Sequence, residues 1–253
     1  MSTEAATLLV DNSNTRTKFR LCKDVEICKE LRICDTQAIT TELIRHLLDG
    51  WSFSSVYVSS VVPRTAAVLK RAFSCPVRFV SVGDDLPVDF SHYEGRNTLG
   101  ADRIANAIGT LSWNKFPAVA VDLGTAVTFD IVTMQSSGKP RYLGGMITPG
   151  LAAYRGYLAA CTALLPRLDA GNDAPSIGIG MNTVQAMRCG LESGGRGMIR
   201  GVLSDIESVL GERPFVIATG GDAGWAASRL PEISIVDSLL TFRGLSKLVK
   251  TES

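Results

Sequence analysis

Short apolar runs that end at turn-forming or charged residues alternate along the chain with segments whose apolar residues recur at helical spacing. The pattern predicts strands over residues 8–11, 19–25, 56–62 and 77–82, and helices over residues 36–48 and 65–73. The second strand follows a polar turn at residues 12–15, so it is expected to fold back on the first. The chain is therefore predicted to open with a strand, a tight polar turn and a second strand.

The same order begins again near residue 119. An apolar run ends at Asp122, and a turn of Gly124, Thr125 and Ala126 follows it. The pattern then predicts strands over residues 127–132, 142–147 and 215–218, and helices over residues 151–160, 183–210 and 223–230. Helices between strands at this spacing favour an α/β fold of two lobes, each a mixed sheet flanked by helices. We expect domains over residues 1–115 and 116–253, with the loosest stretch at residues 169–175.

Composition narrows the possible partners. The 253 residues include 26 Lys and Arg against 25 Asp and Glu, so neither nucleic acid nor an anionic membrane is an expected partner. The apolar runs are shorter than a membrane helix requires, and the start does not resemble a signal peptide, so a cytoplasmic location is predicted. Six cysteines without a Cys-x-x-Cys pair, and only two histidines, predict reduced thiols rather than a structural zinc site.

The two strand–turn–strand units carry the candidate chemistry. A turn with small polar residues aims backbone N–H groups at one point, and the carboxylate beside it can hold a hydrated Mg²⁺. One such turn is common for local reasons, but two in tandem, with a third glycine-rich turn at Gly220 and Gly221, favour a nucleotide site. The chain contains no Gly-x-x-x-x-Gly-Lys-Ser/Thr, Gly-x-Gly-x-x-Gly or Gly-x-Ser-x-Gly motif of the P-loop, Rossmann or α/β-hydrolase kinds.

Six segments resemble, in order, the motifs of type III pantothenate kinases. Residues 11–15 are similar to that family's first phosphate motif, Asp-x-Gly-Asn-Thr, and residues 100–103 match its substrate motif, Gly-x-Asp-Arg, with Tyr93 upstream. Residues 121–126 resemble the second phosphate motif, and residues 144–150 match Gly-Gly-x-Ile-x-Pro-Gly. Residues 177–183 resemble the family segment that ends in Asn-Thr, and residues 218–221 resemble the adenosine motif. The chain thus resembles this family of the actin-like ATPase and acetate-sugar kinase superfamily.

The resemblance implies two RNase H-like lobes with the active site in the cleft between them, in a homodimer whose interface completes the substrate pocket. It implies phosphorylation of pantothenate by ATP to 4′-phosphopantothenate, the first step of coenzyme A biosynthesis. Asp102 would be the general base, a role that suits a carboxylate because phosphoryl transfer needs a positioned acceptor more than a strong base.

The resemblance also implies the binding residues. Pantothenate would contact Tyr93, Gly100, Ala101, Asp102, Arg103 and, from the neighbouring subunit, Thr183. ATP would contact Asp11, Asn12, Ser13, Asn14, Thr15, Arg16 and Thr125. Asp122 would bind a monovalent cation, K⁺ or NH₄⁺, and Asp11 would lie near Mg²⁺ through water.

Each of these residues also has an ordinary structural interpretation. Asp102 could be a carboxylate favoured by a helix start, Arg103 a solvated helix residue, and Tyr93 a surface aromatic. Asp122 could cap its turn, and Thr183 could be a helix N-cap. All of these would have to hold together, in family order, for the resemblance to be accidental.

Two departures from the family motifs bear on function. Ser13 replaces the motif glycine, which would cost roughly 1 kcal/mol or more if the position requires a positive φ. Gly95 and Arg96 stand where the family commonly has Asn-Pro. The alternative functions are a non-catalytic, nucleotide-binding regulatory relative, which only Ser13 favours, and a kinase of the same architecture that acts on a sugar or acetate.

Overall fold

The computed structural model describes residues 6–83, 85–168 and 178–249, so residues 169–175 and Ile177 lie outside it. The described chain forms two compact units. The first comprises Met1–Lys115, Asp130–Gly144 and Leu239–Ser253, and the second comprises Phe116–Phe129 and Gly145–Ser238. The division into RNase H-like domains at residue 115 stays a prediction.

The first unit contains a six-stranded mixed sheet in the order β3-β2-β1-β5-β6, with β4 paired to β2. Its elements are β1 (Thr7–Asn12), β2 (Arg16–Lys23), β3 (Glu26–Ile27), β4 (Arg32–Asp35), α1 (Thr41–Leu47), β5 (Ser55–Ser60), α2 (Pro63–Ala72), β6 (Val77–Phe79), α3 (Ala101–Thr110) and α7 (Leu240–Ser246). Strand β1 is antiparallel to β2 and parallel to β5. This register aligns the end of β1, at Asp11 and Asn12, with the end of β5 at Ser59 and Ser60.

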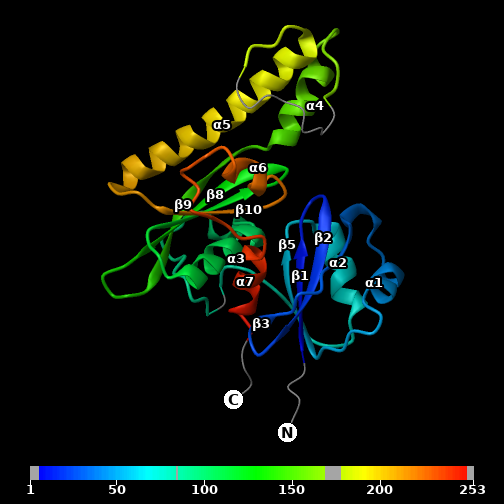
Figure 1. The fold of residues 1–253 in the computed structure, drawn as a ribbon. Coiled ribbons are helices and arrows are strands. Elements are labelled where there is room, and N and C mark those ends of the chain that lie inside the picture. Colours follow the sequence, from blue (N-terminus) through cyan, green and yellow to red (C-terminus); the bar gives the residue numbers. More distant parts are fainter. Residues whose placement is uncertain (1–5, 84, 169–177, 250–253) are drawn as a thin grey trace. The chain divides into compact units, whose positions relative to one another are not determined.

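Alternating apolar residues of this sheet form the core of the first unit. Leu8, Val10 and Phe19 are fully buried, and they belong to one cluster with Ile44 of α1 and Leu69 of α2. Helices α1 and α2 accordingly lie beside β1, β2 and β5 in Figure 1. Helices α3 and α7 pack tightly, because a side chain at Gly109 or Gly244 would collide with backbone atoms of the other helix.

The second sheet has the strand order β11-β10-β7-β8-β9. Its strands are β7 (Ala118–Leu123), β8 (Ala126–Met134), β9 (Pro140–Pro149), β10 (Phe215–Thr219) and β11 (Ile235–Val236), and the remaining helices are α4 (Leu151–Cys161), α5 (Thr183–Leu210) and α6 (Ala223–Ala227). Strand β10 is parallel to both β7 and β11. Helix α5, of 28 residues, is the long helix in Figure 1, with α4 against its N-terminal part. Two mixed sheets flanked by helices confirm the predicted α/β class.

Several predicted boundaries were wrong. A helix over residues 36–48 is replaced by a 3-10 turn at Thr36–Ala38 and by α1, because the Thr40 hydroxyl accepts a hydrogen bond from the Leu43 N–H and starts the helix there. Strand β6 ends at Phe79 and helix α6 at Ala227, both earlier than predicted. Helix α7 and strands β3 and β4 were not predicted. Helix α5 has the predicted bounds.

The six cysteines are all free thiols in the structure. The described ranges contain no group of three or more His, Cys, Asp or Glu side chains that could hold a metal ion. No helix among the described residues has both the length and the apolar character needed to cross a membrane.

Candidate active site

The first predicted phosphate turn is held by a hub of buried polar side chains. The Asn12 side chain, 1% exposed, donates to the Thr17 hydroxyl at 2.6 Å and accepts from the Ser60 and Thr65 hydroxyls at 2.7 Å each. Asn12 therefore joins β1 to β2, β5 and α2 through three side-chain hydrogen bonds inside the unit. Residues 14–16, which follow Ser13 in the turn, are exposed.

Ser13 is accommodated in this turn without left-handed backbone strain. The described non-glycine residues with a positive φ are Asp24, Val25 and Asn114. The Ser13 N–H donates to the Arg16 carbonyl at 3.2 Å, so the turn closes in an ordinary conformation. The expected penalty for serine at this position is therefore absent from the structure.

Asp11 ends β1 with its carboxylate engaged on both oxygens. The Ser13 hydroxyl donates to Asp11 Oδ1 at 2.8 Å, and Lys18 Nζ lies 3.1 Å from Asp11 Oδ2. Lys18 faces Asp11 because the β1–β2 register pairs the two residues. The Lys18 side chain is 35% exposed, so we expect this ion pair to contribute little to stability. It does place a cation beside the predicted phosphate turn.

Asp102 lies in the first turn of α3, after Gly100 as N-cap. Its Oδ1 accepts a hydrogen bond from the Arg103 N–H at 2.8 Å. Asp102 is therefore a carboxylate at a helix start, as its structural interpretation predicted. Burial raises the pKa of the Asp102 carboxyl above its ordinary value; the Arg103 N–H opposes the rise, and the negative charge of Asp11 adds to it. The structure thus places Asp11 and Asp102 within electrostatic range of each other.

Arg103 is buried, so the interpretation of Arg103 as a solvated helix residue was wrong. It is 8% exposed; Nε donates to Asp130 Oδ1 at 2.7 Å, and Nη2 donates to the Tyr142 hydroxyl at 2.8 Å. The Tyr142 hydroxyl donates to the same Asp130 oxygen at 2.8 Å. Tyr93 packs edge-on against Tyr142, with ring centroids 5.2 Å apart. Arg103 and Tyr93, both predicted as substrate contacts, therefore each contact Tyr142.

The second phosphate turn, between β7 and β8, is shaped by glycines. The Gly124 N–H donates to the Ala126 carbonyl at 3.0 Å, and the Gly150 N–H donates to the Thr125 carbonyl at 3.1 Å. A Cβ on Gly150 would overlap the carbonyl oxygens of Gly124 and Thr125, so only glycine allows this approach. Thr125 itself is exposed.

The third turn packs directly on the second. Gly220 has a φ of +90°, and a Cβ there would lie 2.5 Å from the Leu123 carbonyl oxygen and 2.6 Å from Asp122 Oδ1. The Asp222 N–H donates to the Leu123 carbonyl at 3.1 Å. The predicted cation ligand Asp122 thus lies beside carbonyl oxygens, which are the ligand type that hard cations prefer.

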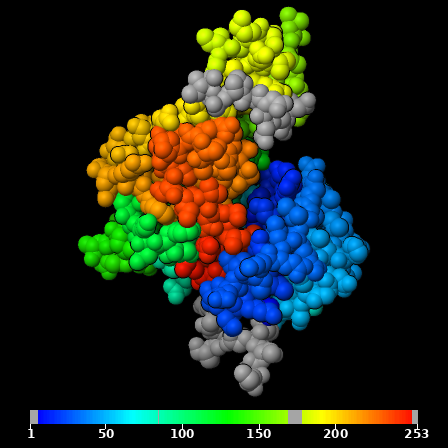
Figure 2. All heavy atoms as spheres, in the orientation of Figure 1, coloured from blue at the N-terminus to red at the C-terminus, as the bar shows by residue number. Residues whose placement is uncertain are grey.

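Thr183 is the first residue of α5 and is exposed. The N-cap is Asn182, whose side chain accepts from the Gln185 N–H at 2.9 Å, so the interpretation of Thr183 as the N-cap was wrong. The start of α5 lies at the surface of its unit together with α4, as Figure 2 shows in yellow and light green. Exposed apolar side chains occur on both helices, among them Tyr157 and Val184, and at Met181 just before α5.

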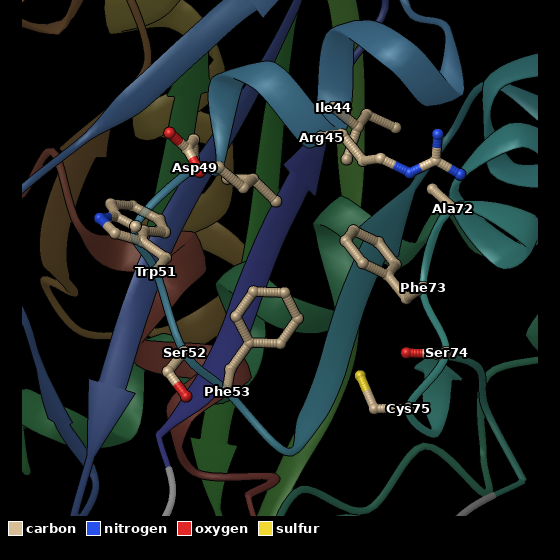
Figure 3. Close-up of a pocket in the computed structure, with 12 residues that line it drawn as sticks. Ile44, Arg45, Asp49, Trp51, Ser52, Phe53, Ala72, Phe73, Ser74 and Cys75 are labelled. Carbon is tan, nitrogen blue, oxygen red and sulfur yellow. The ribbon is translucent and has the colours of Figure 1, made fainter.

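Two pockets of the first unit lie at opposite ends of its parallel strands. One, of about 600 Å³, is lined by Ser60, Asn97, Gly100 and Ala101, among others, near the ends of β5 and β6 and the substrate motif. The other, of about 460 Å³, precedes β5 and β6 and contains the rings of Trp51, Phe53 and Phe73 (Figure 3). Because β1, β5 and β6 are parallel, the aromatic pocket lies at the amino ends of these strands, and Asp11 lies at the carboxyl end of β1.

Sequence reasoning missed Lys18, Asp130 and Tyr142. Asp130 interrupts the apolar run of residues 127–132, and a lone carboxylate in a buried strand requires a partner, so its pattern carried a usable signal. The register pairs Asn12 with Thr17 and Asp11 with Lys18, whereas the turn predicted over residues 12–15 would have placed Arg16 opposite Asp11. Nothing local marks Tyr142 as different from other strand tyrosines.

Solved structures show the fold class of the protein. A Campylobacter jejuni protein described as a Baf family transcriptional activator aligns with a TM-score of 0.61 at 23% identity, covering 95% of this chain and 96% of that one. Glucokinase from an Antarctic psychrotroph aligns with a TM-score of 0.53 at 11% identity, covering 96% and 98%. At these identities the likeness concerns the fold alone, and the fold is that of the actin-like ATPases.

Sequence comparison identifies the family within that class. The family model described as type III pantothenate kinase matches residues 7–205. A type III pantothenate kinase from Akkermansia muciniphila is 42% identical over 238 residues, which cover 94% of this chain and 96% of the relative. The chain belongs to the type III pantothenate kinase family.

Proposed function

We propose that this protein is a pantothenate kinase that transfers the γ-phosphoryl group of ATP to the primary hydroxyl of pantothenate. The product is 4′-phosphopantothenate, at the first step of coenzyme A biosynthesis. The 42% identity to a type III pantothenate kinase over 94% of the chain carries the proposal. The candidate base Asp102 and the carboxylates Asp11 and Asp122 are all retained, so the residues needed for phosphoryl transfer are present.

The ATP phosphates bind at the turn after β1 and the turn after β7, and both turns have exposed residues at their tips. The residues that bind the phosphates are Asp11, Asn12, Ser13, Asn14, Thr15 and Arg16 of the first turn and Thr125 of the second. Since the Asn12 side chain is engaged with Thr17, Ser60 and Thr65, its contribution comes from the backbone. Backbone N–H groups at such turns form anion-binding concavities.

Two cations belong to this assignment. The Asp11 carboxylate ends β1 beside the phosphate turn, where it would hold Mg²⁺ through water, and Mg²⁺ supplies neutralisation of the phosphate charge when it is bound. Asp122, beside the carbonyl of Leu123, would hold the monovalent cation, K⁺ or NH₄⁺. Both positions offer the oxygen ligands that hard cations take.

Asp102 accepts the proton of the attacking hydroxyl. Because the transition state is loose, the main requirement is a carboxylate held in line with the acceptor oxygen, and the first turn of α3 fixes the Asp102 backbone. Pantothenate contacts Tyr93, Gly100, Ala101 and Arg103, of which Gly100 and Ala101 line the pocket of about 600 Å³. Arg103 suits the carboxylate of pantothenate, since guanidinium and carboxylate are complementary in charge and geometry.

The protein functions as a homodimer in this proposal, and Thr183 of the partner subunit completes the pantothenate site. The exposure of Thr183 at the start of α5, and of apolar side chains on α4 and α5, supports an interface there.

The test is a coupled assay of ADP formation with pantothenate, ATP, Mg²⁺ and K⁺. We expect turnover by the wild type and a loss of roughly 10²–10⁴-fold in kcat for Asp102→Asn, as for removal of a general base. Asp205→Asn, at an exposed carboxylate on α5, is the matched control and should keep wild-type activity. Wild-type turnover no higher than that of Asp102→Asn would leave the regulatory function instead.

The pH dependence follows from the environment of Asp102. Its pKa is raised above the ordinary 3.8, and only the ionised carboxylate accepts a proton, so activity is lost as pH falls through that raised pKa. The acid limb of kcat/KM for pantothenate should therefore lie above pH 3.8. An acid limb at or below that value, measured in the same assay, would contradict the assignment of Asp102 as a desolvated base.

A further inference from the structure

We propose that Asp130 and Tyr142 are positioning residues that hold the Arg103 guanidinium and the Tyr93 ring in place to bind pantothenate. This inference rests on the proposed function and adds to it two residues that lie outside every recognised motif of the chain. Both act through other side chains rather than by touching substrate.

Arg103, Asp130 and Tyr142 form a closed triangle of hydrogen bonds. Asp130 is fully buried and Tyr142 is 1% exposed, and the three bonds measure 2.7, 2.8 and 2.8 Å. A buried guanidinium without a partner would be strongly destabilised, so Asp130 is what allows Arg103 to sit inside the unit while charged. The triangle also removes the rotational freedom of the long Arg103 side chain.

The contacts fix which edge of the guanidinium remains for a ligand. Asp130 and Tyr142 occupy Nε and one N–H of Nη2, which form one edge of the planar group. The N–H groups of Nη1 lie on another edge, and they suit the carboxylate of pantothenate. A fixed fork loses less conformational freedom on binding than a mobile side chain would lose.

Tyr142 supports the second predicted substrate contact as well. Its ring packs between Phe90, at 5.1 Å between centroids, and Tyr93, at 5.2 Å. The loop that carries Tyr93 is tied to β9, since the Asp89 N–H donates to the Pro140 carbonyl at 2.8 Å and the Tyr142 N–H donates to the Asp89 carbonyl at 3.0 Å. Displacement of Tyr142 would therefore disturb Arg103 and Tyr93 together.

Tyr142→Phe is the sharpest variant, because it keeps the ring between Phe90 and Tyr93 and removes only the hydroxyl. We expect the KM for pantothenate to rise about 10- to 150-fold, the range for losing a hydrogen bond to a charged group, with the KM for ATP within about twofold of wild type. Tyr57→Phe is the matched control, since Arg78 Nη1 donates to the Tyr57 hydroxyl at 3.0 Å in the same unit. It should leave both KM values unchanged.

A double-mutant cycle separates positioning from general stability. In an Arg103→Ala background, Tyr142→Phe should change the KM for pantothenate by no more than about twofold, because the residue through which it acts is gone. Asp130→Asn should show the same coupling wherever thermal unfolding shows that the variant folds. Equal effects of Tyr142→Phe with and without Arg103, or equal rises in both KM values, would overturn the inference.

These outcomes are distinct from a failure of the proposed function. If the wild type does not phosphorylate pantothenate, the proposed function fails and the inference fails with it. If the wild type is active and Tyr142→Phe behaves like Tyr57→Phe, only the inference is wrong.

Discussion

The two phosphate turns share a topology but are held by opposite means. The turn after β1 is fixed by polar side chains, with Asn12 bonded to Thr17, Ser60 and Thr65. The turn after β7 is fixed by the absence of side chains, since Gly150 and Gly220 allow backbone segments to touch it. One arrangement depends on hydrogen bonds that a substitution deletes, and the other on space that a substitution fills.

This difference separates the positions that tolerate change from those that do not. In the first turn the residue that replaces the family glycine, Ser13, lies at an ordinary φ and makes hydrogen bonds of its own. In the second, a single methyl group at Gly150 or Gly220 would meet backbone carbonyls. We therefore expect the same sequence change, glycine to a small residue, to be harmless in the first turn and damaging where Gly150 and Gly220 pack against the second.

The largest effect is expected for Gly220→Ala. A Cβ at this position combines a left-handed backbone with overlap of the Leu123 carbonyl, so the free energy of unfolding should fall by about 2–5 kcal/mol. ATP binding should weaken as well, because the adjoining turn must shift. Chemical denaturation and ATP titration measure both quantities.

The neighbouring Gly221→Ala is the control for this substitution. Its Cβ would meet no atom within 4 Å, so its free energy of unfolding should stay close to that of the wild type. Equal losses in the two variants would show that the close approach of Gly220 to Leu123 does not hold the second turn.

An intermediate effect is expected for Asn12→Ala in the first turn. Its loss removes one hydrogen bond each from the buried hydroxyls of Thr17 and Thr65, which keep their bonds to Thr36 and to the Val62 carbonyl, and the free energy of unfolding should fall by about 1–3 kcal/mol. Asn14→Ala, at an exposed side chain two residues later, should be close to neutral for stability. Thermal unfolding compares the two variants. An Asn12→Ala variant as stable as the wild type would show that the hydrogen bonds of Asn12 do not hold the first turn.

The smallest effect is expected for Ser13→Gly. Since Ser13 needs no left-handed backbone, glycine relieves no strain, and the added freedom of the unfolded chain should lower stability by up to about 1 kcal/mol. The KM for ATP should stay within about threefold of wild type. A tenfold fall in that KM would show that serine does hinder the phosphate turn.

The sequence predicted those parts of the site that local residues decide. The turns, the start of α3 and the bounds of α5 follow from turn formers, caps and apolar periodicity, and they hold. The separation of Thr36–Ala38 from α1 was missed because two threonines compete as helix starts, and only the cap at Thr40 resolves it.

The supports of the site could not be predicted because they join distant parts of the chain. Asp130 and Tyr142 come from β8 and β9, while Arg103 comes from α3, and no local pattern brings them together. The backbone angle of Ser13 was likewise open, since serine is compatible with several turn types.

A crystal structure with a non-hydrolysable ATP analogue, Mg²⁺ and pantothenate tests the central claim most directly. We predict contacts to the same triphosphate from residues of the turn after β1 and from Thr125 of the turn after β7, with Asp102 within hydrogen-bond distance of the pantothenate primary hydroxyl. A nucleotide held by only one of the two turns, or a hydroxyl that faces away from Asp102, would contradict it.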